Sequence, residues 1–416
     1  MSYDNPAVAA SLKRFEGGYP ETIELSLGRI KAVLETMGRP QDKLPPVIHV
    51  AGTNGKGSTC AYLRAMSEAA GKRVHVFTSP HLVRFNERVR LAGSLIDDTY
   101  LISCLDRTFE ALGGREITHF EATTAAALLA FSETEADLLV LEVGLGGRFD
   151  ATNVIEHPCL SVITPVDFDH KQFLGTDLAK IAGEKAGIIK PGRPVVSAIQ
   201  SRVCGDVIIA EAERLQAPYV GLSIEDLEFV PESVALPGTH QRYNAALAGL
   251  ALRRQEAFEI LPDAIWKGAR TATWPARMQH LKDGPLTRKV PGCEVWLDGG
   301  HNPHAGAAVA ELLRQMGGTT VLVSAMMASK DHASFFREFR DVVLAVHTTP
   351  NAPGHAGAPP EDLAEAARTV ITDTHAHASL DAALSAAARH KADRILICGS
   401  LYLAGDVLAA NDEVPA

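Results

Sequence analysis

An apolar stretch that runs into glycines decides the fold: Val47-Ile48-His49-Val50-Ala51-Gly52-Thr53-Asn54-Gly55-Lys56-Gly57-Ser58-Thr59. The apolar half predicts a short buried strand, and residues 60–70 predict a helix. Glycines let the backbone turn with its N–H groups pointing inward, and a helix start adds N–H donors and a positive dipole end. The lysine supplies a mobile positive charge, and a hydroxyl can ligand Mg²⁺. The stretch therefore predicts a phosphate-binding loop between a strand and a helix.

This loop departs from the common pattern G-x-x-x-x-G-K-[ST] at two places. Val50 occupies the first glycine position, and Gly57 separates Lys56 from Ser58. A glycine-rich surface turn is the alternative interpretation. The small residues at a strand-to-helix junction favour the phosphate site.

Length and composition limit the class of protein. The chain has 416 residues, which predicts two domains, and its net charge of −10 disfavours binding to nucleic acid or to an anionic membrane. No apolar run approaches the roughly 18 residues of a membrane span, and no export signal begins the sequence. The six cysteines are scattered without a C-x-x-C pair, so neither zinc nor a disulfide framework is expected. We expect a cytoplasmic protein.

Strands and helices alternate along the chain. Apolar runs at 74–77, 137–144, 160–166 and 195–199 predict strands, and 98–112, 123–131 and 177–189 predict helices. This alternation predicts an α/β fold with a doubly wound, mostly parallel sheet. Residues 268–291, rich in Pro, Gly and charge, form the candidate hinge. We place the domain boundary after residue 285, so that 1–285 form the nucleotide-binding domain and 286–416 a second, smaller α/β domain.

Several polar residues follow predicted strands, where the ligand crevice of an open α/β sheet lies. Glu142 ends a buried strand and is a candidate Mg²⁺ ligand, with an ion pair to Arg148 as the alternative. His170 is a candidate metal ligand or a solvated loop histidine. The turn that begins at Asp298 could contact a ligand or simply start a helix. The His375 and His377 pair favours a surface position over a metal site.

These residues together predict an Mg·nucleotide site and leave open what is phosphorylated. A GTPase switch is disfavoured because no N-K-x-D guanine motif occurs in the sequence.

A set of motifs, in order along the chain, identifies a family that this sequence resembles. They are HVAGTNGKGST (49–59), SPHLVRFNER (79–88), LEVGLGGRFDATN (141–153), DFDHKQFLG (167–175), GEKAGIIK (183–190), HQRYNA (240–245), WPAR (274–277) and DGGHNPH (298–304). They resemble the folylpolyglutamate synthase/dihydrofolate synthase family of Mur-ligase-like ATP-dependent amide ligases. The unusual loop, with a glycine after the lysine, is itself the form found in that family.

The resemblance implies a fold and a reaction. A P-loop domain like the Mur ligase central domain would precede a smaller Rossmann-like domain that closes over the ATP and glutamate sites. A substrate carboxylate would attack the γ-phosphate of ATP, and glutamate would then displace phosphate from the acyl phosphate. The substrates implied are ATP, L-glutamate, dihydropteroate and reduced folates, with Mg²⁺ at two sites. Whether a monovalent cation takes part stays open, and a monomer is expected.

The same resemblance implies roles for individual residues. ATP contacts correspond to Asn54, Gly55, Lys56, Gly57, Ser58, Asn244, Arg277 and Asp298. Metal ligands correspond to Ser79, Glu142 and His170, and Lys185 corresponds to a lysine that the family carries as a carbamate (N6-carboxylysine). Lys56, His170, Lys185 and His301 are the implied catalytic residues. Pterin and folate contacts correspond to Thr22, Ile23, Glu24, Leu25, His119, Phe120, Glu121, Ala122, Phe149, Asp150 and Ala151.

Four alternatives to a bifunctional synthase remain. They are a folylpolyglutamate synthase alone, a Mur-type ligase for another acid, a small-molecule kinase and a nucleotide-binding switch without catalysis.

Overall fold

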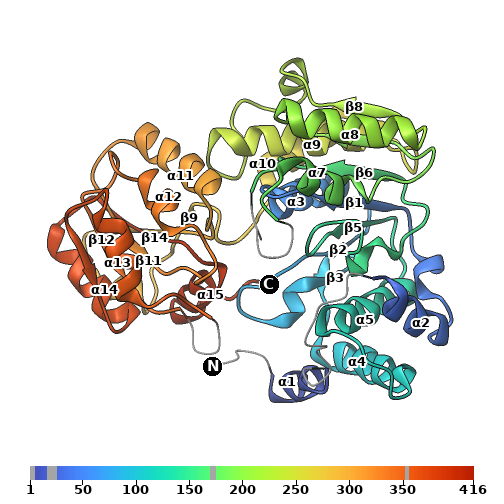
Figure 1. Ribbon diagram of the computed structural model, residues 1–416, viewed down its shortest axis with the longest axis horizontal. Helices are drawn as coiled ribbons and strands as arrows, with labels where there is room; N and C mark the ends of the chain where they lie inside the picture. Colours follow the sequence, from blue (N-terminus) through green and yellow to red (C-terminus); the bar gives the residue numbers. More distant parts are fainter. Residues whose placement is uncertain (1–4, 16–25, 169–174, 352–355) are drawn as a thin grey trace. The chain divides into compact units, whose positions relative to one another are not determined.

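The structure, a computed structural model, describes residues 5–15, 26–168, 175–351 and 356–416. Contacts divide the chain into two compact units, each with its own β-sheet (Figure 1). The larger unit comprises residues 2–235 and 241–273, and the C-terminal unit comprises 236–240 and 274–415. None of the helices in the described ranges is long and apolar enough to cross a membrane.

The larger unit is built on an eight-stranded sheet in the order β4-β3-β2-β5-β1-β6-β7-β8. Its strands are β1 (Val47–Ala51), β2 (Val74–Phe77), β3 (Val89–Leu91), β4 (Ser94–Leu95), β5 (Leu138–Glu142), β6 (Leu160–Ile163), β7 (Val195–Ser197) and β8 (Tyr219–Gly221). Six of them, from β2 to β8, run parallel, whereas β3 and β4 pair antiparallel at one edge. The doubly wound, mostly parallel sheet is confirmed, and the antiparallel edge was not predicted.

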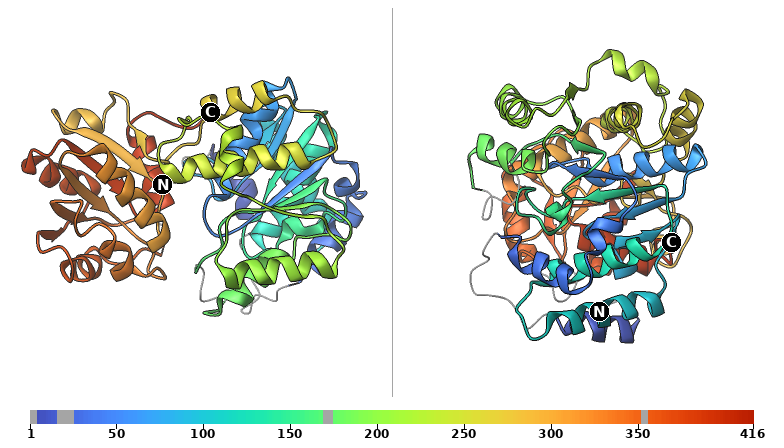
Figure 2. Two further views of the ribbon diagram at one scale, coloured as in Figure 1. Left: turned by 90° about the horizontal axis from the view of Figure 1, so that it is seen from above. Right: turned by 90° about the vertical axis from the view of Figure 1, so that its right-hand side faces the viewer.

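Helices cover both faces of this sheet (Figures 1 and 2). They are α1 (Pro6–Lys13), α2 (Gly28–Thr36), α3 (Lys56–Ala69), α4 (Asp98–Leu112), α5 (His119–Glu133), α7 (Leu178–Ala186), α8 (Arg202–Arg214), α9 (Thr239–Arg254) and α10 (Pro262–Thr271). Helix α3 packs against β1, β2 and β5, and α10 packs against α3, whereas α7 and α8 pack against each other. The strand β1, which leads into the glycine-rich loop, lies between β5 and β6 in the middle of the sheet.

The C-terminal unit has a six-stranded sheet in the order β13-β12-β11-β14-β10-β9. Its strands are β9 (Gln279–His280), β10 (Glu294–Asp298), β11 (Thr320–Ser324), β12 (Ala345–Thr348), β13 (Thr374–Ala376) and β14 (Arg394–Cys398). Its helices are α11 (Pro303–Met316), α12 (His332–Arg337), α13 (Pro360–Arg368), α14 (Leu380–Ala387) and α15 (Leu401–Ala410). All strand pairs are parallel except β9 with β10. This is the second α/β domain that the alternation predicts.

The change from the larger unit to the C-terminal unit, between residues 273 and 274, falls within the candidate hinge at 268–291, and a hinge motion there stays a prediction. Gly268 lies inside α10, where a Cβ atom would stand 2.4 Å from the Met66 backbone, so this glycine lets two helices approach closely. Further along, β9 pairs with β10, and contacts therefore group residues 274–285 with the C-terminal unit. Within this segment, a glycine therefore also serves the close packing of two helices.

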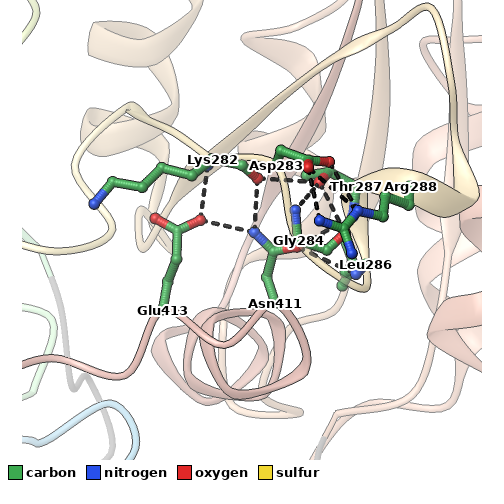
Figure 3. Close-up of polar contacts among 8 residues, drawn as sticks. All are labelled: Lys282, Asp283, Gly284, Leu286, Thr287, Arg288, Asn411 and Glu413. Atoms are coloured by element: carbon green, nitrogen blue, oxygen red, sulfur yellow. Dashed lines mark hydrogen bonds and ion pairs between the residues drawn. The ribbon is translucent and has the colours of Figure 1, made fainter.

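Residues 411–413, which follow α15, are hydrogen-bonded to the loop 282–287 (Figure 3). The buried side chain of Asn411 accepts from the N–H groups of Leu286 and Thr287, each at 3.1 Å. Its amide nitrogen donates to the Lys282 carbonyl at 3.0 Å and to Glu413 at 2.7 Å. An Asn side chain has two donors and an acceptor oxygen with two lone pairs, and all four are used here. The loop 282–287 is therefore fixed to the C-terminal segment.

Four histidines meet at the edge of the C-terminal sheet. His347 on β12 is 2% exposed, and its Nδ1 lies 2.9 Å from Nε2 of His377, whereas its Nε2 lies 3.1 Å from Nε2 of His390. The exposed His375 stacks on its ring and pairs with Asp373. The expected surface position thus holds for His375, whereas His377 belongs to the histidine cluster. His347 contacts its neighbours through opposite nitrogens, so these rings share hydrogen bonds and do not converge on one point.

This cluster makes the stability of the C-terminal unit depend on pH. Burial, followed by the neighbouring His377, His390 and His375, lowers the pKa of His347 from 6.5 to about 4, against a smaller opposing effect of Asp373. Below pH 6.5 the unfolded chain then binds more protons than the folded chain. The contribution of His347 to stability is therefore present above that pH and is lost as the pH falls toward 4. We expect the free energy of unfolding to drop by about 1–2 kcal/mol between pH 7 and pH 5. Urea unfolding at pH values between 5 and 7 measures this free energy. In His347→Gln the free energy of unfolding should change less with pH, and the same pH dependence as in the wild type would contradict the prediction.

Candidate active site

The glycine-rich loop joins β1 to α3 through two backbone positions that need glycine. Gly52 has φ +149°, and a Cβ atom there would lie 1.8 Å from Oγ1 of Thr164. Gly55, which begins α3 as its N-cap, has φ +82°, and its Cβ would lie 2.7 Å from Oδ1 of Asn244. Side chains at these positions would be strained and would also clash. The loop therefore keeps its backbone close to both β6 and α9.

Part of this loop is tied to the segment after β6. The N–H groups of Thr53 and Asn54 donate to the carbonyl of Pro165 at 2.9 and 3.2 Å, and the Thr53 hydroxyl bonds the backbone of Asp167. These amides hold the loop in shape. The donors suited to an anion are the first N–H groups of α3, from Lys56 onward, which have no acceptor inside the helix.

Two lysine side chains meet at one carbonyl of the loop. Nζ of Lys56 donates to Gly52 O at 3.2 Å and to Thr53 O at 3.5 Å. Nζ of Lys185, from α7, donates to the same Gly52 O at 2.9 Å, and this side chain is buried. Two ammonium groups on one carbonyl repel each other unless an anion lies nearby. The arrangement suits a bound phosphate, or a negative charge carried by one of the lysines.

The position of Lys185 is set by the glycine-rich segment that follows β5. A Cβ atom on Gly147 would lie 2.5 Å from the Glu184 carbonyl and 3.0 Å from Cα of Lys185. The next residue, Arg148, donates its N–H to the Glu184 carbonyl at 2.8 Å. This contact fixes the last turn of α7 against the loop, and with it the lysine.

Oxygen donors gather at the carboxyl ends of the neighbouring strands β5 and β2. Oε2 of Glu142, which is 4% exposed, accepts from the backbone N–H of Ser79 at 3.2 Å. The alternative partner Arg148 lies near Glu184 and Glu211 instead, at 3.8 and 3.5 Å. A carboxylate and a hydroxyl are the hard oxygen ligands that Mg²⁺ prefers. Glu142 and Ser79 therefore fit a magnesium site.

The third implied metal ligand, His170, lies outside the described residues. Among those that the structure does describe, His, Cys, Asp and Glu form no group of three arranged to hold a metal ion.

Helix α9 brings amide side chains to the loop. Asn244, implied as an ATP contact, packs on Gly55, and its Nδ2 donates to Oε1 of Gln241 at 3.1 Å. Gln241 in turn donates to the buried Ser58 hydroxyl at 3.2 Å. Sequence reasoning did not single out Gln241 or Thr164. The first lies within the HQRYNA motif and could have been found there, whereas no pattern marked the second.

The implied folate residues around α5 have different environments. Phe120 packs over Gly144, where a Cβ atom would stand 2.4 Å from its ring, and it also contacts Phe77. Glu121 forms a capping box with Thr118 and an ion pair with Arg29 at 3.1 Å, so its carboxylate secures the start of α5. His119 contacts Phe85 edge-on. Ala122 is fully buried in the hydrophobic core.

The remaining implied folate residues lie on the loop before β6 or outside the structure. Phe149 is 42% exposed, whereas Asp150 and Ala151 are buried. Burial raises the pKa of Asp150, and hydrogen bonds from Thr152 and Leu145 act against that rise. Thr22, Ile23, Glu24 and Leu25 fall outside the described residues.

In the C-terminal unit, three implied residues lie around the end of β10. The buried Asp298 accepts from the N–H groups of Met278 at 2.8 Å and Gly300 at 2.7 Å. His301 contacts the Gly299 carbonyl through Nδ1 at 2.9 Å, and Arg277 donates to the Ala276 carbonyl. His240, which also belongs to this unit, lies near Asp298 and Arg277, and burial lowers its pKa. Arg277, Asp298 and His301, the implied site residues of this unit, thus lie together around the end of β10.

These features define a class of enzyme. The C-terminal part matches the family model described as Mur ligase, glutamate ligase domain, over residues 277–401. With a glycine-rich strand-to-helix loop and a buried carboxylate at a strand end in the larger unit, the chain has the parts expected of an ATP-dependent amide ligase of the Mur type. Its relatives narrow the class, and the chain belongs to the dihydrofolate synthase/folylpolyglutamate synthase family.

Three relatives illustrate this membership. The dihydrofolate synthase/folylpolyglutamate synthase of Bacillus subtilis is 37% identical over 357 residues, which cover 78% of this chain and 81% of that protein. The structure of Escherichia coli FolC in complex with DHPP and ADP matches with a TM-score of 0.86 and 30% identity over 98% of both chains. A bifunctional folylpolyglutamate synthase/dihydrofolate synthase with Mn, AMPPNP and L-glutamate bound matches with a TM-score of 0.83 and 29% identity over 99% of both chains.

The loop geometry predicts the effect of a single methyl group. Gly52→Ala should weaken binding of an ATP analogue about tenfold or more, because the new Cβ would clash with Thr164 and shift residue 52, whose own carbonyl both lysines contact. Gly71→Ala is the matched control, since Gly71 also has positive φ, +76°, but nothing lies within 4 Å of its Cβ position. Isothermal titration with AMPPNP measures both variants. Equal affinities for the two would contradict the assignment of the loop.

Proposed function

We propose that this chain joins L-glutamate to the carboxylate of dihydropteroate, forming dihydrofolate, and to the carboxylate of reduced folates, forming folylpolyglutamates. One observation carries the proposal: two lysines meet at the carbonyl of Gly52, just after β1, and Glu142 ends the neighbouring strand β5. That arrangement suits the triphosphate of ATP with a divalent cation. Relatives in the same family are named for both synthase activities.

Two chemical steps follow from the proposal. An oxygen of the substrate carboxylate attacks the γ-phosphorus of ATP, the bond to the β,γ-bridging oxygen breaks, and ADP leaves. The neutral amine of glutamate then attacks the carbonyl carbon of the acyl phosphate. The tetrahedral intermediate expels inorganic phosphate, the amine loses a proton, and an amide remains. Carboxylates are poor electrophiles, so ATP is needed to make a leaving group.

The described residues would support these steps mainly by position and charge. Lys56 and the first N–H groups of α3 hold the phosphates and neutralise charge as ADP departs. Mg²⁺ held by Ser79 and Glu142 would supply further charge neutralisation for the phosphates. In the C-terminal unit, Arg277 and Asp298 are proposed to contact ATP, and His301 to contact phosphate or glutamate. Asn244 and Ser58 are proposed to line the loop.

Three further expectations from the sequence stay predictions. These are a part for a monovalent cation, a monomeric state and a cytoplasmic location.

A paired assay tests the function. Purified protein should release ADP with dihydropteroate and with tetrahydrofolate, in each case only when L-glutamate is present. Lys56→Ala should lower turnover by about a hundredfold or more, because the phosphates lose their charge partner while the fold is kept. Release of phosphate with a UDP-muramoyl acceptor alone would favour the Mur-type alternative. A stable phosphorylated product formed without glutamate would favour a kinase.

The carbamate on Lys185 has its own test. A carbamate would replace one of the two converging ammonium groups by an anion that can orient the metal. Lys185→Ala should therefore be inactive and should regain part of its turnover when a small carboxylic acid such as acetate is added. ADP release with and without acetate measures the rescue, and Lys180→Ala, on the exposed side of α7, serves as the control. An inactive variant that no carboxylic acid rescues would count against the carbamate.

A further inference from the structure

A histidine is buried in the middle of the large sheet, close to the phosphate loop. His49 lies on β1, three residues before Gly52, and its register partners are Leu141 on β5 and Ser161 on β6. Its side chain has no exposed surface. A polar ring in such a place is costly unless it makes hydrogen bonds. Its Nε2 lies 2.9 Å from the hydroxyl oxygen of Thr152.

That hydroxyl begins a chain of hydrogen bonds into the loop 144–153. Thr152 donates its hydroxyl to Oδ1 of Asp150 at 2.5 Å, and its N–H donates to the same oxygen at 3.0 Å. The second carboxylate oxygen of Asp150 accepts from the N–H of Leu145 at 2.8 Å. The chain His49–Thr152–Asp150–Leu145 therefore ties the central strand to both ends of the loop.

The direction of these hydrogen bonds defines which nitrogen of the His49 ring carries the proton. Because the Thr152 hydroxyl donates to Asp150, its oxygen accepts from His49, whose Nε2 must carry the proton. Among the described residues, Nδ1 of His49 has no hydrogen-bond partner. Burial lowers the pKa of His49 to about 3, so the ring is neutral at any working pH. A neutral ring in one tautomer is a fixed donor and does not carry protons during turnover.

The loop held in this way has contacts on two sides. It carries Phe149, which is 42% exposed, and begins at Gly144, on which Phe120 packs. It also touches the end of α7 through Gly147 and Arg148. The described hydrogen bonds of Asp150 all go to donors of the loop itself. Asp150 thus shapes the loop on which the folate-side residues lie.

We propose that His49 is a positioning residue for the pterin substrate, acting through Thr152 and Asp150 on the loop 144–153. This inference rests on the proposed function and on the resemblance, which assigns Phe149, Asp150 and Ala151 of this loop to the pterin side. His49 would not touch the substrate. Its fixed N–H sets where Thr152 and Asp150 stand, and so where the aromatic ring of Phe149 is presented.

A set of histidine variants tests this role against a purely structural one. His49→Leu removes the donor, whereas His49→Gln keeps an N–H group near the Nε2 position. His75 on β2 is the matched control: it too has no exposed surface, and its Nε2 bonds the Thr134 carbonyl while Nδ1 accepts from Ala92. Neither of those partners belongs to the loop. The assay measures KM for dihydropteroate, KM for ATP, kcat against pH and the urea midpoint.

We expect His49→Leu to raise KM for dihydropteroate about tenfold or more, with KM for ATP changed less than about twofold. His49→Gln should restore most of the affinity, and the pH profile of kcat should not move in any variant. His75→Leu should lower the urea midpoint without changing either KM. Thr152→Val, which keeps the volume but removes the hydroxyl, should raise KM for dihydropteroate as His49→Leu does. It takes the place of His49→Leu in the test if His49→Leu does not fold.

Even if KM for dihydropteroate rises in the His49 variant, three results would overturn the inference. They are an equal rise in both KM values, the same KM change in His75→Leu, or a shifted pH profile, which would indicate proton transfer. The wild type is assayed first. If it does not release ADP with dihydropteroate, the proposed function fails; if it does, and the His49 and Thr152 variants keep a normal KM, only the role of His49 fails.

Discussion

The meeting of two lysine ammonium groups at the carbonyl of Gly52 is the contact on which the large unit depends. It needs β1 to end at this point, Gly52 to adopt φ +149° and α7 to approach from another part of the chain. Like charges come together only where an anion compensates for them. The arrangement of these two side chains therefore favours an anion beside Gly52, either a bound phosphate or a carbamate on Lys185.

The parallel sheet makes this arrangement possible. The carboxyl ends of its parallel strands lie along one edge, so Gly52 after β1, Glu142 at the end of β5 and Ser79 after β2 come together although they are separated in sequence. Glycines at 144 and 147 then let Phe120 and the end of α7 pack directly on the loop that follows β5. The lysines, the Glu142 carboxylate and the loop proposed for the folate side are thus placed by one set of strand ends.

Much of this could be predicted from local pattern. The glycine-rich loop, the buried carboxylate at Glu142 and the alternation of strands and helices each have a signature within a few residues. Composition at 268–291 marked the region in which one unit gives way to the other, but it could not show the contacts of this segment with Met66 and Asn411, which lie far away in sequence. Glu121 looked like a substrate contact, yet its carboxylate also caps α5 and pairs with Arg29.

The sequence by itself determined the class of fold, the position of the phosphate loop and, through its motifs, the family. Those depend on residue type and short spacing, which the chain displays directly. Only the tertiary structure decided that Lys185 shares a carbonyl with Lys56, that Gln241 reaches Ser58 and that His49 bonds Thr152. These contacts join residues about 100 to 180 positions apart, where no local pattern specifies a partner and the packing of the sheet does.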